Sequence, residues 1–173
     1  MYREYLGHNM RLAVIVNPDA GLGGRLGFKG SDGRAAEARA AGAQDRAGPR
    51  MRQCLEKLAE LAREPIEIVA WDGRMGGDWI PGEYTSTGVT PQTTDASSTS
   101  DFIKAHSPDL FLYAGGDGTT RDIVEALGER NIPLVGVPGG VKMHSGCFAT
   151  TPKAAAEVVW SFVTGDLMVA RTE

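Results

Sequence analysis

The 173-residue sequence has few of the features that mark secreted, membrane-spanning or nucleic-acid-binding proteins. It has only two cysteines, Cys54 and Cys147, too few for a disulfide framework and without metal-site spacing. No apolar run approaches the length of a membrane span, and residues 1–8 lack the apolar core of a signal peptide. The 22 acidic residues outnumber the 18 basic ones, and a net charge of −4 argues against a nucleic-acid or anionic-membrane surface. We therefore expect a cytoplasmic protein.

Histidine is also scarce, and the overall composition is that of a globular domain. His8, His106 and His144 are far apart and show no ligand spacing, so a zinc site is not expected. The length suffices for one well-buried domain and is too short for two of normal size, so we expect a single domain over residues 1–173. The 23 glycines exceed average usage and concentrate at turns, which directs attention to those turns.

Short apolar runs alternate with helical patterns along the chain. Strands are predicted at 11–16, 66–71, 110–114 and 133–137, and helices at about 34–41, 50–63, 101–106, after Thr119 and after Thr151. The Ser/Thr-rich stretch 84–100 is predicted to be a loop. Strands separated by helices with short connections specify an α/β fold, a three-layer sandwich with a mostly parallel sheet.

The most informative turn follows the strand at 110–114. It reads Gly-Gly-Asp-Gly-Thr over residues 115–119, and Thr119 with Asp122 forms a capping signal for the next helix. Glycine lets a bulky anion approach the backbone, and a helix N-terminus favours negative charge, so this is a site for phosphate. Asp117 would repel phosphate; an acid here makes better sense as a proton acceptor or as a partner of magnesium.

Two further glycine-rich turns follow predicted strands. Segment 17–24 reads Asn-Pro-Asp-Ala-Gly-Leu-Gly-Gly, and segment 138–146 reads Pro-Gly-Gly-Val-Lys-Met-His-Ser-Gly. Loops that leave the carboxyl ends of parallel strands share one edge of the sheet, where ligands bind, so the three turns are expected to converge on one nucleotide. Neither the Gly-x-Gly-x-x-Gly spacing from Gly21 nor a Gly-Lys-Ser/Thr sequence is present, which excludes two known phosphate fingerprints.

These motifs, together with Phe-Lys-Gly-Ser-Asp-Gly at 28–33, resemble the ATP-NAD kinase superfamily, including its Rossmann-like N-terminal domain. The resemblance is strongest to the branch that contains predicted ATP- or polyphosphate-dependent NAD kinases and the acetoin-catabolism X proteins. It runs from about Arg11 to the end of the chain. The Gly-Gly-Asp-Gly-Thr motif is shared with diacylglycerol and sphingosine kinases, whereas Lys-Met-His-Ser at 142–145 is more discriminating.

The resemblance implies transfer of a phosphoryl group from ATP or polyphosphate to the 2′-hydroxyl of the adenosine ribose of NAD, assisted by Mg²⁺. It implies that Asp117 accepts or orients the hydroxyl proton, that Asn17 orients the nucleotide and that Lys142 neutralises developing charge. Arg121 would reach phosphate or pair with Glu125. The remaining residues expected to contact nucleotide are Gly21, Gly23, Gly24, Gly115, Gly116, Gly118, Thr119, Gly139, His144 and Ser145.

Members of this superfamily generally carry a second, mostly β domain, and residues 167–173 read as the start of another strand. We therefore expect this chain to be the N-terminal domain alone, and expect relatives of this kind to assemble as homo-oligomers. Two alternatives stay open. One is a kinase of another small hydroxyl substrate, from the acetoin pathway or a lipid, although the Gly-Thr-Gly-Asn-Asp motif usual in lipid kinases is missing. The other is a non-catalytic nucleotide-binding module.

Overall fold

The computed structural model describes residues 9–22, 34–140 and 143–166 of the chain. Five strands form one sheet: β1 (Arg11–Val16), β2 (Glu67–Asp72), β3 (Thr85–Val89), β4 (Leu110–Gly115) and β5 (Leu134–Pro138). The helices are α2 (Ala35–Ala40), α3 (Ala47–Leu61), the short 3₁₀ helix η2 (Gly77–Trp79), α4 (Ala96–Ala105), α5 (Asp117–Leu127) and α6 (Pro152–Thr164).

The strand order is β3-β2-β1-β4-β5, and every pairing between these strands is parallel. From β1 the chain moves outward through β2 to β3, then returns to the other side of β1 as β4 and β5. The strand order therefore reverses between β1 and β4, which makes this the topological switch point of a doubly wound sheet. The predicted α/β fold with a mostly parallel sheet is confirmed.

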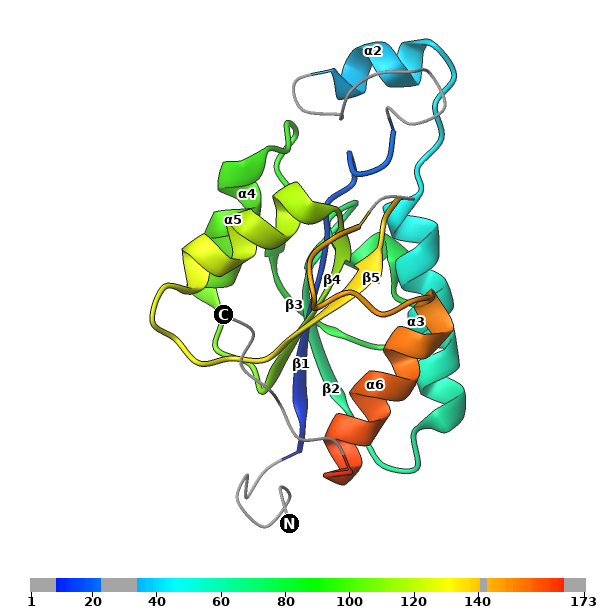
Figure 1. The fold of residues 1–173 in the computed structure, drawn as a ribbon, viewed down its shortest axis with the longest axis vertical. Coiled ribbons are helices and arrows are strands. Elements are labelled where there is room, and N and C mark those ends of the chain that lie inside the picture. The colour runs from blue at the N-terminus through cyan, green and yellow to red at the C-terminus, as the bar shows by residue number, and fades with distance from the viewer. Residues whose placement is uncertain (1–8, 23–33, 141–142, 167–173) are drawn as a thin grey trace.

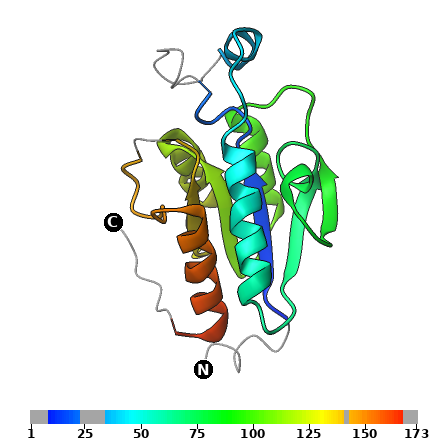
Figure 2. The same cartoon turned by 90° about the vertical axis from the view of Figure 1, so that its right-hand side faces the viewer.

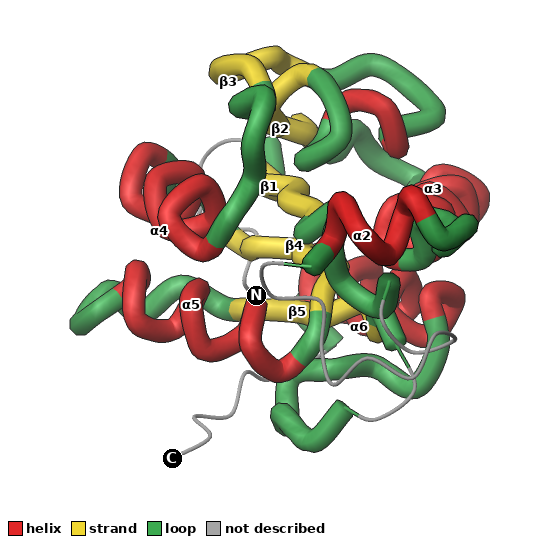
Figure 3. The backbone as a smooth tube through the Cα atoms, turned by 90° about the horizontal axis from the view of Figure 1, so that it is seen from above, coloured by secondary structure: helices red, strands yellow, loops and turns green. Residues whose placement is uncertain are grey.

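The helices cover the sheet in two layers (Figure 1). Seen from above, α4 and α5 lie on one side of the strands and α3 and α6 on the other (Figure 3). A quarter turn of the molecule shows α3 and α6 side by side (Figure 2). This three-layer arrangement follows from strands that are apolar on both faces, because each face must be covered by a helix layer.

Strand β1 shows how alternating side chains build two separate cores. Leu12 and Val14 pack in the cluster that contains the buried residues of α3 and α6, whereas Ala13 and Ile15 pack in the cluster of α4 and α5. Strand β4 is buried along its whole length and alternates in the same way. Full burial of a large apolar side chain stabilises the fold by about 1.5–3 kcal/mol, so the two central strands are its most strongly held part.

Two predicted boundaries are wrong, both in the Ser/Thr-rich stretch. Residues 85–89 form the edge strand β3 rather than a loop, and α4 begins at Ala96 rather than at about residue 101. Four of the five residues of β3 are exposed, so the strand lacks the buried alternation that a sequence pattern reveals. The serines after Asp95 form a capped helix start. The Asp95 carboxylate accepts the N–H groups of Ser97 and Ser98 at 2.9 and 3.1 Å.

Two more helices begin earlier than predicted. α3 begins at Ala47 rather than 50, with Pro49 in the first turn, where the missing N–H has no helical partner to lose. α5 begins at Asp117, so Thr119 is its third residue and not its cap. The Thr151 cap and the Gly165 terminus of α6 are confirmed. The strand predicted over 167–173 lies outside the described residues. Within the described ranges, no helix is both long enough and apolar enough to cross a membrane.

After the third turn the chain returns along the outer edge of β5. The N–H of Gly136 donates to the carbonyl of Cys147 at 2.8 Å, and the N–H of Ala149 donates to the carbonyl of Gly136 at 3.0 Å. The Phe148 ring packs where a side chain at position 136 would lie: a Cβ there would be 2.6 Å from Phe148 Cδ1 and 2.9 Å from Tyr113 Oη. Gly136 is thus required for the returning segment to lie against β5.

We expect Gly136→Ala to lower the free energy of unfolding by about 1–3 kcal/mol, because the added methyl group displaces Phe148. Urea unfolding of the purified chain measures this change. Gly82→Ala is the matched control, since a Cβ at Gly82 meets no atom within 4 Å. The control should unfold within about 0.5 kcal/mol of wild type. Equal unfolding free energies for the two variants would contradict the packing role of Gly136.

Candidate active site

The three glycine-rich turns meet at the carboxyl edge of the sheet. The N–H of Gly139 donates to the carbonyl of Gly115 at 2.8 Å, and the N–H of Asn17 donates to the carbonyl of Ala114 at 2.9 Å. Glycine is required where the turns approach each other most closely. A Cβ at Gly139 would lie 2.8 Å from the Gly115 oxygen, and a Cβ at Gly21 would collide with the carbonyl of Gly139. The predicted convergence of the turns is confirmed, at the switch point between β1 and β4.

Asn17 and Thr119 connect the first turn to the second. The Asn17 side-chain amide donates to Thr119 Oγ1 at 2.9 Å, and its carbonyl accepts the N–H of Asp19 at 3.1 Å. Thr119 Oγ1 also accepts the N–H of Gly116 at 3.3 Å. Thr119 is buried, with 4% of its surface exposed. Both side chains therefore hold the two turns together, a role that the sequence analysis did not assign to them.

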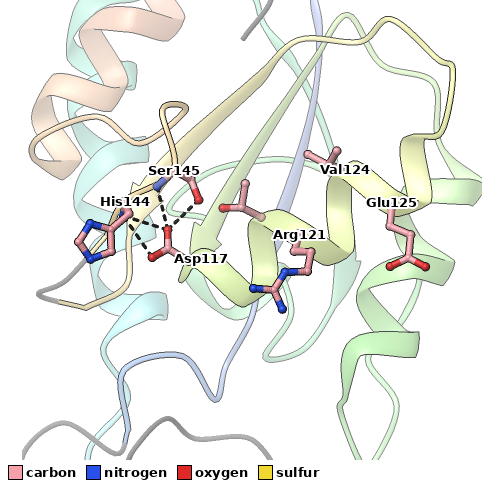
Figure 4. Close-up of a pocket in the computed structure, with 7 residues that line it drawn as sticks. Asp117, Arg121, Val124, Glu125, His144 and Ser145 are labelled. Atoms are coloured by element: carbon pink, nitrogen blue, oxygen red, sulfur yellow. Dashed lines mark hydrogen bonds between the residues drawn. The ribbon is translucent and has the colours of Figure 1, made fainter. Parts of the chain in front are cut away.

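Asp117 stands at the first position of α5 and points toward the third turn (Figure 4). Its Oδ1 atom accepts the N–H of His144 at 3.0 Å, the N–H of Ser145 at 2.9 Å and the Ser145 hydroxyl at 2.7 Å. Its Oδ2 atom shares the His144 N–H at 3.1 Å. The carboxylate thus joins the second turn to the third by four hydrogen-bonding contacts.

These donors set the charge state of Asp117. The Ser145 hydroxyl, above all, lowers the pKa of the carboxyl below its usual value, and the N–H groups of Ser145 and His144 act in the same direction. Partial desolvation opposes them without reversing the shift. Asp117 is therefore fully ionised near neutral pH. A carboxylate of lowered pKa is a weak proton acceptor, but it orients a hydroxyl or binds a cation well.

An open pocket of about 590 Å³ lies beside this carboxylate, along the exposed side of α5. It is lined by Asp117, Thr120, Arg121, Val124, Glu125, His144 and Ser145. Arg121 is exposed and has no hydrogen-bond or ion-pair partner among the residues that the structure describes, so the pairing with Glu125 is not formed. The pocket therefore offers an anionic group and an unpaired cation one helical turn apart on the same helix.

The remaining predicted site residues fall into two groups. Gly116, Gly118 and His144 lie with Asp117 in the second and third turns, and Gly118 is exposed with open space around its Cα. Gly23, Gly24 and Lys142 lie outside the described residues. His144 contributes its backbone N–H to Asp117 and is one of the residues that line the pocket.

The sequence analysis missed Arg50, which holds the third turn from the opposite side of the sheet. Its guanidinium donates to the carbonyls of Pro138 at 2.7 Å and Gly140 at 3.1 Å. Nothing in the sequence pattern marks this arginine, because α3 and the third turn are nearly 90 residues apart. Their contact arises only when α3 packs beside β5.

A chain of ion pairs fixes the first turn and was also missed. Arg39 of α2 pairs with Asp19 at 2.8 Å and with Asp45 at 3.2 Å, and Asp45 pairs with Arg74 at 3.1 Å. The hydroxyl of Thr94 donates to Asp19 Oδ2 at 3.1 Å. Segments on either side of β1 are thereby connected above the carboxyl edge, where α2 lies (Figure 1).

Both cysteines pack against other side chains. Cys54 is fully buried on α3, and burial raises the pKa of its thiol to about 12, so it stays protonated and unreactive at neutral pH. Cys147 Sγ lies 3.4 Å from Tyr113 Oη, which in turn lies 2.6 Å from Thr120 Oγ1. This partly buried group of two hydroxyls and a thiol supports the base of the third turn.

The fold and site define a doubly wound α/β domain with a glycine-lined crevice at its switch point, the place where such sheets bind ligands. The ATP-NAD kinase N-terminal domain family matches residues 12–167. The chain belongs to this family, which confirms the resemblance identified from its motifs.

Individual relatives match over parts of their length. A stretch of 50 residues is 46% identical to an NAD kinase of Cytophaga hutchinsonii and covers 29% of this chain and 16% of that protein. A crystal structure described provisionally as a diacylglycerol kinase of Bacillus anthracis strain Sterne gives a TM-score of 0.48 at 17% identity, covering 89% of this chain and 41% of that one. A UDP-N-acetylglucosamine 2-epimerase gives 0.40 at 11% identity, covering 90% and 40%. The chain thus covers less than half of each protein.

Removal of the Arg50 guanidinium should loosen the third turn. We expect Arg50→Ala to lower the free energy of unfolding by about 1.5 kcal/mol, the typical value of a charged hydrogen bond, and to shift the amide resonances of Gly139 and Gly140. Urea unfolding and ¹H–¹⁵N spectra measure these changes. Arg63→Ala, which removes a guanidinium bonded to the nearby carbonyl of Glu60, is the control and should cost less than about 0.5 kcal/mol. Unmoved glycine resonances in Arg50→Ala would show that this side chain does not hold the turn.

Proposed function

We propose that this chain is the nucleotide-binding part of a kinase that transfers the terminal phosphoryl group of ATP or polyphosphate to the 2′-hydroxyl of NAD, forming NADP. One observation carries the proposal: the ionised carboxylate of Asp117 stands where three glycine-rich turns meet at the switch point. Membership of the ATP-NAD kinase family supports this reaction. Phosphoryl transfer depends on positioning and charge neutralisation more than on covalent chemistry, and the site offers both.

The phosphate chain would lie against the start of α5. The first N–H groups of a helix have no acceptor within it and favour an anion, and the exposed Gly118 leaves room for close approach. Gly115 and Gly139 have a different role, because each is already packed against backbone or side-chain atoms of the site. Gly115 and Gly139 would therefore serve the packing of the turns, whereas Gly118 would face the phosphate.

Asp117 would orient the acceptor hydroxyl, and its lowered pKa suits this task better than removal of a proton. A carboxylate oxygen of Asp117 could also bind Mg²⁺. In the described ranges no three His, Cys, Asp or Glu side chains gather as a metal site, so the ion would be held by Asp117 together with phosphate oxygens. When bound, Mg²⁺ supplies neutralisation of charge on the phosphates.

Arg121 would bind an anionic part of the acceptor in the pocket along α5. Its guanidinium is exposed and unpaired among the described residues, one turn beyond Asp117. An acceptor whose phosphorylated hydroxyl lies near a phosphate, as in NAD, would satisfy Asp117 and Arg121 together.

The reaction is tested by incubating the protein with NAD, Mg²⁺ and either ATP or polyphosphate. NADP should form, and Asp117→Asn should reduce its rate by about 100-fold or more while preserving the fold, because the change keeps the shape and removes the charge. Asp101→Asn, at an exposed position on α4, is the control and should retain the wild-type rate. A folded wild type that yields no NADP would exclude NAD as acceptor. Equal rates for the Asp117 variant and wild type would remove Asp117 from the mechanism.

Gly118→Ala separates ligand binding from folding. A Cβ at Gly118 meets no atom within 4 Å, and alanine is favoured over glycine in a helix, so stability should stay equal or rise by up to about 1 kcal/mol. Affinity for MgATP, measured by calorimetry, should nevertheless fall by about tenfold or more, because the methyl group occupies the space of the phosphate. Gly82→Ala again serves as control. Unchanged affinity in Gly118→Ala would place the phosphate away from α5.

A further inference from the structure

The two oxygens of the Asp117 carboxylate have different surroundings. Three of the contacts from the third turn reach Oδ1, at 2.7, 2.9 and 3.0 Å. Among the described residues, Oδ2 receives only a share of the His144 N–H, at 3.1 Å. A carboxylate oxygen has two lone pairs, so Oδ1 is saturated and Oδ2 keeps acceptor capacity.

Ser145 contributes most to this difference. It supplies two of the three contacts to Oδ1, one from its backbone and one from its hydroxyl, and the hydroxyl contact is the shortest of the four. The His144 N–H, by comparison, lies almost equally far from both oxygens and does not distinguish them. Ser145 therefore decides which oxygen is committed to the protein.

The donors of Ser145 are held in place by the surrounding scaffold. Before it in the chain, Arg50 binds the carbonyls of Pro138 and Gly140. After it, residues 147–149 pair with Gly136 of β5. A donor on a segment anchored at both sides loses little freedom when it binds the carboxylate, so it is preorganised for its role.

We propose that Ser145 is a positioning residue: its hydroxyl and N–H anchor Asp117 through Oδ1, so that Oδ2 alone meets the acceptor hydroxyl or the magnesium ion. This inference rests on the proposed phosphotransferase function. It changes the role expected for Ser145, from a residue that contacts the nucleotide to one that acts through Asp117. An anchored carboxylate holds the acceptor hydroxyl in one fixed direction. Phosphoryl transfer requires this, because the attacking oxygen must lie in line with the bond from phosphorus to the leaving oxygen.

The charged and titratable groups around Asp117 are few among the described residues. They are His144 on the third turn, Arg121 on α5 and Tyr113 on β4. Burial raises the pKa of Tyr113, so it stays neutral over the range in which Asp117 titrates. The Ser145 hydroxyl is the largest cause of the lowered pKa of Asp117, so its removal should raise that pKa.

Carboxyl ¹³C NMR of this chain tests the contact without any need for activity. In wild type, the Asp117 carboxyl carbon and the amide protons of His144 and Ser145 should follow one titration curve, which disappears from the amides in Asp117→Asn. Ser145→Ala should move that curve to higher pH, and Ser145→Thr, which keeps a hydroxyl, should bring it back toward wild type. Ser86→Ala, on the exposed edge strand β3, is the matched control and should leave the curve unchanged.

An Asp117 titration that is the same in Ser145→Ala and wild type would overturn the proposal, as would amide protons that ignore this titration in wild type. The second result is measured on wild type alone, so the proposal can be rejected even if Ser145→Ala does not fold. Both results are independent of NADP formation, and absent activity would count against the proposed function alone.

Steady-state kinetics of the proposed phosphotransferase reaction supply a second test. Ser145→Ala should lower kcat by about tenfold while the KM for ATP stays within about twofold, because the hydroxyl holds a group that acts on the acceptor. Ser145→Thr should recover most of the rate. A raised KM for ATP with unchanged kcat would instead make Ser145 a direct nucleotide contact and reject the positioning role.

Discussion

The close approach of two glycine backbones determines how the site is built. Gly139 donates to the carbonyl of Gly115, and a Cβ added at Gly139 would lie 2.8 Å from that carbonyl oxygen and would separate the third turn from the second. This approach brings Ser145 within reach of Asp117. Without it the carboxylate would be an exposed group at the first position of α5 with no fixed direction. The Asp117 carboxylate is thus oriented by Ser145 and His144, which the close approach of the two glycine backbones brings within reach.

The sequence predicts those parts of the molecule in which burial and function leave a local pattern. Strands β1, β4 and β5 are short apolar runs that are each followed by a glycine-rich turn, and the rule that parallel strands share a carboxyl edge was enough to group these turns. Strand β3 was missed because its side chains face water and carry no alternation. The start of α4 was missed because a run of serines resembles a loop until Asp95 is seen to cap it.

The contacts inside the site were less predictable, because they depend on packing between distant segments. Asp117 was identified from its motif, but its anchoring by Ser145 depends on the path of the third turn. That path is fixed by Arg50 on α3 and by the return of Phe148 along β5. Asn17 and Thr119, both expected to contact the nucleotide, also bind each other. Residue type indicated where the chemistry lies, and tertiary contacts decided which atoms remain available for it.

The ion pairs around α2 give the site two halves of unequal character. Asp117 stands at the end of β4, whose stability comes from apolar burial and is almost insensitive to dissolved salt. Asp19 and the first turn are held by Arg39 and its partners, which are partly exposed and are weakened by counterions. High ionic strength would therefore loosen the first turn and leave the position of Asp117 unchanged. The affinity of such a site for a polyanion could thus change with the salt concentration while the orientation of the Asp117 carboxylate stays the same.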